Sequence, residues 1–155
     1  MALDRTQFRF STSLKVRNYE VDWQGIVHNA VYLLYFETAR IAYLEEMGVK
    51  IDLEAIRRES QIVVARNEID YRRPARFGEV LDIATRISFI RESSFAFEGI
   101  IDSGITGDRI AENVAIHVWL DQKMGKPVRV SREFRDSVHR YEGKKAVIQW
   151  PEDMA

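Results

Sequence analysis

Hydrophobic and polar residues alternate along residues 8–17, near the start of the chain. Phe8, Phe10 and Leu14 share one face of this segment, and serine, lysine and arginine side chains share the other. A period of two residues is typical of a strand with one face in water. We therefore predict a first strand here, followed by a loop over residues 18–29.

The next segment, residues 30–47, is apolar on almost every side. Gly48 stands where a glycine commonly ends a helix, and His28 or Asn29 is placed to cap its beginning. A helix that is apolar all round is typical of one enclosed by other elements rather than laid on a surface. The pattern therefore predicts one long, wrapped helix.

Four further runs rich in β-branched and aromatic residues follow the helix, separated by proline, glycine and serine. These runs occupy residues 62–71, 80–90, 95–101 and 110–120. Their short connections favour antiparallel neighbours. After a turn at residues 125–127, Ser131 is placed to cap a short helix. We predict an α+β fold with a five-stranded antiparallel sheet wrapped around one long central helix, plus a short C-terminal helix.

The elements fit a single domain over residues 1–155, with a core at about residues 8–135 and a C-terminal extension over 136–155. The tail from Lys144 carries apolar residues, but the pattern predicts no element there. A sheet that covers one side of a helix leaves the other side and its own edges free. This predicts pairing with a second copy of the chain.

The amino-acid composition and net charge exclude several classes of protein and of chemical site, but they do not identify the function. The chain is 46% hydrophobic and 30% charged, which is ordinary for a globular protein, and its net charge of −1 gives no general attraction to nucleic acid or an anionic membrane. There are no cysteines, which excludes disulfides, thiol nucleophiles and thiolate metal sites. We see no signal peptide, and the most apolar run is far shorter than the ~20 residues that span a bilayer. We expect a cytoplasmic protein.

The loop before the long helix holds the most promising chemistry. It contains two carboxylates, a glycine, an amide and a histidine within residues 18–29. The start of a helix offers backbone N–H groups without partners and the positive end of a dipole. These groups suit an oxygen that gains negative charge during acyl transfer.

Residues 22–32, Asp-Trp-Gln-Gly-Ile-Val-His-Asn-Ala-Val-Tyr, resemble the signature of the 4-hydroxybenzoyl-CoA thioesterase family of hot-dog proteins. Three later segments resemble the family in the same order: residues 35–40, 71–79 and 125–130. The likeness covers about residues 8–135. It implies a hot-dog fold and hydrolysis of an acyl-CoA-type thioester to an acid and a thiol, in a homodimer or homotetramer with the site between subunits.

By position in this motif, Asp22 matches the family's catalytic carboxylate, acting as nucleophile or as general base. The backbone N–H of Asn29 matches the donor that polarises the thioester carbonyl. The pair His28-Asn29 differs from the Tyr-His of many members and from the Asn-Asn of those nearer acyl-carrier-protein thioesterases. The side-chain roles of His28 and Asn29, and the choice between CoA and acyl-carrier protein, therefore stay open.

The resemblance further implies a set of substrate-binding residues. In the signature they are Trp23, Gly25 and Tyr32. Arginines suit the phosphates of CoA, so the set also includes Arg72, Arg76, Arg91 and Ser94. We expect no metal, because three scattered histidines without cysteine make a poor site, and no cofactor other than the CoA of the substrate.

Three alternatives remain. The substrate could be an acyl-carrier-protein ester, or the chain could be a non-catalytic module that binds acyl thioesters. A hot-dog hydratase or dehydratase would use His28 in the loop and Glu37 on the helix, although Asp22 argues against it. Glu37 also lies three residues before Arg40, which is suited to a structural ion pair. Glu20 is expected to be a solvated neighbour of Asp22, and His117 a packed, hydrogen-bonded core residue.

Overall fold

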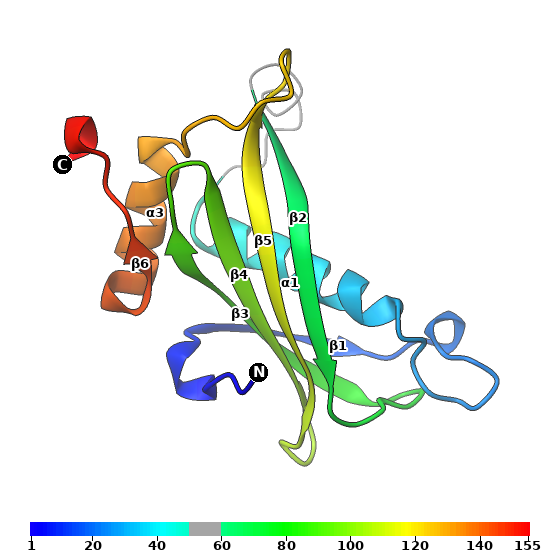
Figure 1. Cartoon of the computed structure of the whole chain (residues 1–155). Helices are drawn as coiled ribbons and strands as arrows, with labels where there is room; N and C mark the ends of the chain where they lie inside the picture. The colour runs from blue at the N-terminus through cyan, green and yellow to red at the C-terminus, as the bar shows by residue number, and fades with distance from the viewer. Residues whose placement is uncertain (50–59) are drawn as a thin grey trace. The chain divides into compact units, whose positions relative to one another are not determined.

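The computed structural model describes residues 1–49 and 60–155. Its strands are β1 (Phe10–Lys15), β2 (Ser60–Tyr71), β3 (Val80–Ile90), β4 (Ser94–Ser103), β5 (Arg109–Asp121) and β6 (Val147–Ile148). Its helices are α1 (Val31–Glu46) and α3 (Arg132–Glu142), with short 3-10 turns η1 (Arg5–Gln7), η2 (Asn18–Glu20), η3 (Gly143–Lys145) and η4 (Glu152–Met154) (Figure 1). The five predicted strands and both predicted helices are present.

The strands form one sheet in the order β1-β3-β4-β5-β2. Strand β1 runs antiparallel to β3, with Phe10 opposite Thr85 and Lys15 opposite Val80. The apolar tail adds a short sixth strand, β6, which pairs in parallel with Phe89 and Ile90 of β3. The predicted five-stranded sheet is therefore extended by one strand that the sequence pattern did not indicate.

The described chain divides into two compact units. The first contains residues 1–43, 68–86 and 98–113, and the second contains residues 44–49, 60–67, 87–97 and 114–155. Most of α1 and all of the loop before it belong to the first unit. The Asp22 loop and the start of α1 therefore lie in one compact unit.

In the first unit, α1 packs closely on β4. A Cβ atom at Gly99 would lie 2.5 Å from a ring carbon of Phe36, so only glycine allows the helix to approach this far. Near the end of the helix, Tyr43 meets Phe10 of β1 edge to face, with ring centroids 5.8 Å apart. These contacts fix α1 against the strands, so the start of the helix has a defined position.

The other face of α1 is open. Leu34 is 59% exposed and Ile41 is 45% exposed, although both are large and apolar. The enclosure predicted for this helix is therefore one-sided within the single chain. An exposed apolar stripe on a helix is consistent with the predicted pairing with another copy.

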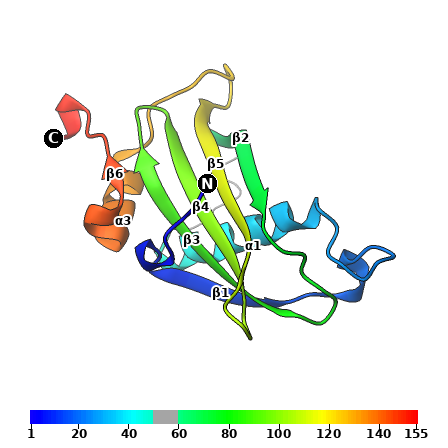
Figure 2. The same cartoon turned by 60° about the horizontal axis from the view of Figure 1, so that its bottom comes forward.

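The N-terminal segment lies over the strands of the first unit (Figure 2). The Leu3 N–H donates to Oε1 of Glu112 at 2.9 Å, and Arg5 pairs with Asp82 at 3.2 Å. Glu112 is almost fully buried on β5. Ion pairs with Arg72 and Arg109 compensate its charge.

The second unit has a core of aromatic side chains. Phe95 stacks on His117 with centroids 5.4 Å apart and contacts Phe134 of α3 at 5.0 Å. His117 is buried, which confirms the expected packed position. Ser131 accepts the N–H of Phe134 at 3.2 Å and caps α3 as predicted. Figures 1 and 2 show β6 beside this helix.

Candidate functional site

The loop that carries Asp22 is a tight hydrogen-bonded turn. The Gly25 N–H donates to the Asp22 carbonyl at 3.0 Å, and the Asp22 N–H donates to the carbonyl of Ile26 at 2.9 Å. Gly25 has φ of +76°, a conformation that favours glycine. The Asp22 side chain accepts the N–H of Gln24 at 2.8 Å. One carboxylate oxygen therefore caps the turn, and the half-buried Asp22 is held in a fixed position.

A second turn, after β2, supports this loop. Val27 donates its N–H to the carbonyl of Ala75 at 2.9 Å, and Phe77 donates to the carbonyl of Gly25 at 3.2 Å. Ile26 also forms an antiparallel bridge with Arg76. Two segments that lie about fifty residues apart in sequence are thus joined by main-chain hydrogen bonds, so the position of Asp22 depends on both.

Glu20 is buried, and the expectation that it would be solvated is wrong. Its carboxylate accepts the phenol of Tyr35 at 2.5 Å and pairs with Arg17. Burial alone would raise the pKa of Glu20, but the hydrogen bonds from Arg17 and Tyr35 outweigh it and hold the pKa below its usual range. Burial and the Glu20 carboxylate together raise the pKa of Tyr35, which therefore stays protonated as a donor. This contact ties the loop to α1.

Replacing Glu20 with glutamine should destabilise the protein at pH 7 by about 1–3 kcal/mol, the usual cost of breaking a buried charged hydrogen-bond network. Because the folded pKa of Glu20 is lowered, its stabilising effect is present above the unfolded pKa and is lost as the pH falls through the folded pKa. Urea unfolding between about pH 3 and pH 7 should show a smaller pH dependence for Glu20→Gln than for wild type. The exposed Glu45→Gln serves as control. Parallel pH profiles for Glu20→Gln and wild type would contradict the assignment.

The backbone N–H of Asn29, at the start of α1, is a donor that the described fold does not use. The His28 carbonyl accepts the N–H of Val31 at 2.9 Å, and Nδ1 of His28 accepts the N–H of Ala30 at 3.2 Å. The His28 ring thus makes a capping contact. Within residues 1–49 and 60–155, the Asn29 N–H has no hydrogen-bond partner. It is therefore free to bind an added acceptor.

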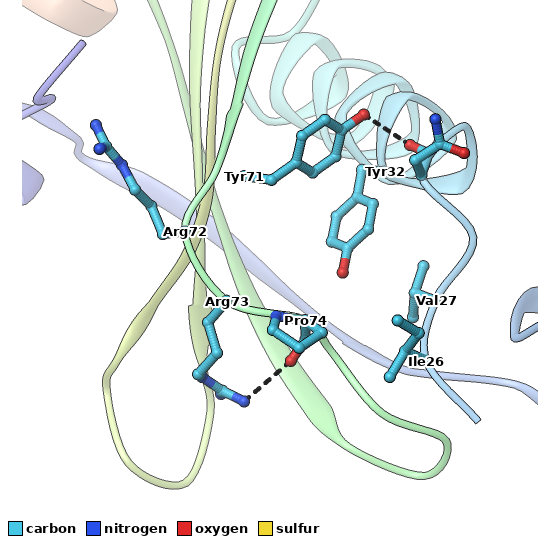
Figure 3. A pocket seen from close by; sticks show the side chains of 8 residues that line it. Ile26, Val27, Tyr32, Tyr71, Arg72, Arg73 and Pro74 are labelled. Carbon is cyan, nitrogen blue, oxygen red and sulfur yellow. Dashed lines mark hydrogen bonds between the residues drawn. The ribbon is translucent and has the colours of Figure 1, made fainter. Parts of the chain in front are cut away.

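A pocket of about 370 Å³ opens beside this helix start. Figure 3 shows Ile26 and Val27 on one side and the rings of Tyr32 and Tyr71 on the other. Asn29, Arg72, Arg73 and Pro74 complete the lining. The Tyr32 phenol accepts the N–H of Ala75 at 3.0 Å, and burial raises its pKa, which keeps it neutral. A mostly apolar pocket with a few polar groups is typical of a small-molecule site.

The structure brings part of the predicted site together. Asp22, Gly25, His28 and Asn29 lie in one loop, and Tyr32 and Arg72 line the pocket next to it. Trp23 lies at the tip of the turn and is 91% exposed. The roles assigned to these residues stay predictions.

The predicted phosphate-binding residues are more scattered. The Arg72 guanidinium pairs with Glu112 at 3.0 Å and Asp70 at 3.6 Å, so internal carboxylates already engage it. Arg76 is exposed and lies outside the pocket lining. Arg91 and Ser94 belong to the second unit, where the Arg91 N–H donates to the Ser94 carbonyl at 2.8 Å and closes the β3–β4 turn.

Glu37 and Arg40 differ in their surroundings. Glu37 is exposed, whereas Arg40 is buried and donates to Oδ1 of Asn113 at 2.5 Å. Burial lowers the pKa of Arg40 to about 10, and the negative charge of Glu37 acts in the opposite direction. Among the described residues no direct ion pair joins Glu37 to Arg40, and the Arg40 guanidinium instead hydrogen-bonds to Asn113 of β5.

The sequence did not indicate Tyr71, Ile26, Val27 or Pro74 as site residues, and it indicated Arg73 only as part of a basic run with Arg72 and Arg76 suited to phosphate. Tyr71 ends β2, and its phenol donates to the Asn29 carbonyl at 2.9 Å (Figure 3). Arg73 pairs with Glu79 at 2.6 Å and donates to the carbonyl of Pro74 at 3.2 Å. The motif over residues 71–79 was the only sequence signal for the side of the pocket that residues 71–74 form. It gave no direction in which these side chains would point.

Metal-binding and membrane-spanning features are not found in the described part of the chain. Residues 1–49 and 60–155 contain no group of three or more histidine or acidic side chains placed to hold a metal ion. No helix in the same residues is long and apolar enough to cross a membrane.

A sequence model of the thioesterase-like superfamily matches residues 16–138. The chain therefore belongs to the thioesterase-like superfamily. The match includes the Asp22 loop, α1, the residues of the pocket and most of α3. It confirms the hot-dog fold expected from the sequence, together with structural neighbours of the same fold.

Several relatives are named as thioesterases. The chain is 34% identical over 122 residues to the chloroplastic acyl-acyl carrier protein thioesterase ATL3 of Arabidopsis thaliana, which covers 79% of this chain and 63% of the relative. It thus spans less than two thirds of that relative's length. It is 29% identical over 127 residues to the long-chain acyl-CoA thioesterase FadM of Escherichia coli K12, covering 82% of this chain and 95% of FadM.

The fold is also close to that of solved thioesterases. A crystal structure of a Thermus thermophilus thioesterase complexed with coenzyme A and Zn superposes with a TM-score of 0.76 at 30% identity, covering 88% of this chain and 96% of that one. A 1,4-dihydroxy-2-naphthoyl-CoA thioesterase from Synechocystis superposes with a TM-score of 0.78 at 16% identity, covering 83% of this chain and 94% of that one. The second similarity supports the fold alone.

Proposed function

We propose that this protein hydrolyses acyl-CoA-type thioesters to a free acid and a thiol, as a member of the 4-hydroxybenzoyl-CoA thioesterase group. The observation that carries the proposal is the Asn29 N–H without a partner, at the start of α1 and on the rim of an apolar pocket. A carbonyl oxygen bound there would gain a hydrogen bond that strengthens as negative charge develops on it. The names of the relatives point to the same reaction.

Asp22 is the proposed catalytic carboxylate. As a nucleophile it would attack the carbonyl carbon, expel the thiolate and form a mixed anhydride that water then hydrolyses. As a general base it would take a proton from the attacking water. Both routes yield the acid and the thiol, and both place charge on the carbonyl oxygen near Asn29. A thiol leaves readily because its pKa is about 8.5, so no strong general acid is required. We propose that no metal or cofactor takes part.

The proposed substrate enters as a CoA ester, with the acyl group directed to the pocket between Tyr32 and Val27. This part of the lining is apolar and aromatic, as an acyl or aryl group requires, while Asn29, Arg72 and Arg73 are the polar members of the lining. Trp23, exposed at the turn tip, is a candidate contact for the pantetheine chain. Acyl-carrier protein is the alternative carrier, since the Arabidopsis relatives are named for it.

We further propose that the working form is a homo-oligomer. The open apolar side of α1, with Leu34 and Ile41, would be covered by a second copy. Binding such a surface to itself is the usual route to a symmetric dimer. In such an assembly the partner would complete the site.

The proposal is tested by measuring thiol release from aryl-, short-, medium- and long-chain acyl-CoA esters with a thiol-reactive dye. We expect the protein to hydrolyse at least one class of acyl-CoA ester, at a rate proportional to the enzyme concentration. Buffer without enzyme should show no such hydrolysis. The preferred chain length would then identify the acyl group. If every CoA ester is inert, the same acyl groups on acyl-carrier protein are tested next. Absence of turnover on both carriers would refute the proposal, and binding without turnover would favour a non-catalytic module.

A further inference from the structure

One peptide group at the start of α1 is held at both ends by side chains. Its carbonyl, from Asn29, accepts the phenol of Tyr71 at 2.9 Å. Its N–H, from Ala30, donates to Nδ1 of His28 at 3.2 Å. Tyr71 lies 42 residues away at the end of β2. The hydrogen bond therefore ties the helix start to the sheet.

The neighbouring peptide, between His28 and Asn29, is fixed by the helix itself. Its carbonyl accepts the N–H of Val31 at 2.9 Å and so points into the first turn of α1. In a trans peptide the N–H and the carbonyl point in opposite directions, and all described peptide bonds are trans. The Asn29 N–H must therefore point outward from the start of the helix.

Asn29 thus stands between two restrained peptides. The first turn of α1 restrains the peptide before it, and the Tyr71 hydrogen bond helps to hold the peptide after it, whose carbonyl lies on the far side of the Asn29 Cα. Nothing else among the described hydrogen bonds holds this carbonyl. The direction of the Asn29 N–H is therefore supported both by the first turn of α1 and by a phenol from another part of the chain.

Tyr71 is itself well fixed. Its ring packs edge to face on that of Tyr32, with ring centroids 5.3 Å apart (Figure 3). The Tyr32 phenol in turn accepts the N–H of Ala75 at 3.0 Å. Burial raises the pKa of Tyr71, so the phenol remains a donor at neutral pH. Both Tyr71 and Asn29 line the pocket.

We infer that Tyr71 is a positioning residue for thioester hydrolysis, orienting the Asn29 backbone N–H toward the substrate carbonyl through its hydrogen bond to the Asn29 carbonyl. The inference rests on the proposed function. A donor fixed before the reaction stabilises developing charge without the cost of reorganising. Because this charge develops mainly in the transition state, loss of the phenol should affect kcat rather than KM.

The test is Tyr71→Phe, which keeps the ring and its contact with Tyr32 but removes the hydroxyl. Kinetics are measured on the acyl-CoA that wild type hydrolyses fastest, alongside thermal unfolding. We expect kcat to fall about 10-fold with KM within about 2-fold, as for a misaligned donor rather than a lost one. The midpoint of unfolding should stay close to that of wild type. Tyr19→Phe, at an exposed tyrosine of η2, is the matched control and should leave kcat unchanged.

A second measurement observes the carbonyl directly. The probe is the ketone analogue of the same substrate, in which a methylene replaces the sulfur. Its carbonyl stretching frequency should shift downward on binding wild type, and this shift should be smaller on Tyr71→Phe.

Unchanged kcat and unchanged carbonyl shift in Tyr71→Phe, with active wild type, would overturn the inference and leave the proposed function standing. A fall in kcat accompanied by a loss of thermal stability, with the carbonyl shift retained, would assign Tyr71 a merely structural role and also overturn it. Inactive wild type on CoA and acyl-carrier-protein esters would instead overturn the proposed function, and the inference with it.

Discussion

Replacing Asp22 with asparagine should lower kcat for thioester hydrolysis by about 100-fold or more, the loss expected for a catalytic carboxylate. Asparagine keeps the side-chain oxygen that accepts the Gln24 N–H, so the turn around Gly25 should persist. What disappears is the negative charge, and with it both the nucleophile and the base. The measurement is thiol release under saturating acyl-CoA, with circular dichroism and thermal unfolding to show that the fold is retained.

The chain offers a close control at Asp121. Its carboxylate accepts the N–H groups of Lys123 and Met124 at 3.0 and 2.7 Å, and its carbonyl accepts the N–H of Gly125 at 2.8 Å. This turn has the same chemistry as the turn of Asp22 but belongs to the second unit. Asp121→Asn should therefore leave kcat unchanged. Equal activity of Asp22→Asn and wild type would show that Asp22 is only a turn residue and that another group supplies the catalysis.

The elements with strong local signals were predicted closely. The helix expected over residues 30–47 is Val31–Glu46, and Gly48 follows it with φ of +79°. The alternation of hydrophobic and polar residues predicted β1. The proline, glycine and serine residues between the later hydrophobic runs predicted where β2 to β5 begin and end. These elements are determined by residues that are close together in the sequence, and the periodicity of hydrophobic residues reports on such local patterns. The short strand β6 was missed because two residues carry no period, and its pairing with β3 is decided by tertiary contact.

The sequence predicted the side of the candidate site that the Asp22 loop and the start of α1 form, but not the side that the end of β2 forms. The motif located the Asp22 loop and the helix start, because those residues are consecutive in the chain. The opposite wall comes from the end of β2, and nothing in the local pattern of Tyr71 shows that it faces Asn29. Glu20 was misjudged for the same reason, since its burial depends on Tyr35, fifteen residues later. In both cases the deciding partner lies outside the window from which a local prediction is made.

The second unit depends on a buried arginine that no motif indicated. Arg135 of α3 is fully buried, and its guanidinium donates to four main-chain carbonyls. Those carbonyls belong to Val130 at 3.1 Å, Arg91 at 2.7 Å, Glu92 at 3.0 Å and Gln149. One side chain therefore joins α3 to the β3–β4 turn and to the chain after β6. Burial lowers the pKa of Arg135, and a guanidinium remains charged in proteins.

Arg135→Met should lower the free energy of unfolding by about 3–5 kcal/mol, the range for breaking one side of a buried charged network. Methionine fills much of the space but donates nothing, so the four carbonyls lose the donor that Arg135 supplies. In a chain of 155 residues this corresponds to a fall of about 6–20 °C in the unfolding midpoint. Chemical denaturation and thermal melts measure the effect, and hydrogen exchange at Gln149, whose N–H donates to the carbonyl of Ile90, reports whether the segment after β6 detaches.

Arg132→Met on the same helix is the control, because Arg132 is exposed and its 3.7 Å contact with Asp136 is a surface ion pair. Such pairs contribute about 0–1 kcal/mol. Equal stability of Arg135→Met and Arg132→Met would contradict the prediction. It would mean that water replaces the guanidinium at all four carbonyls without a loss of stability. Arg135→Lys separates charge from geometry: an ammonium keeps the charge but lacks the planar fork of donors. We therefore expect it to recover only a small part of the loss, which would show that the geometry of the guanidinium holds the C-terminal segment in place.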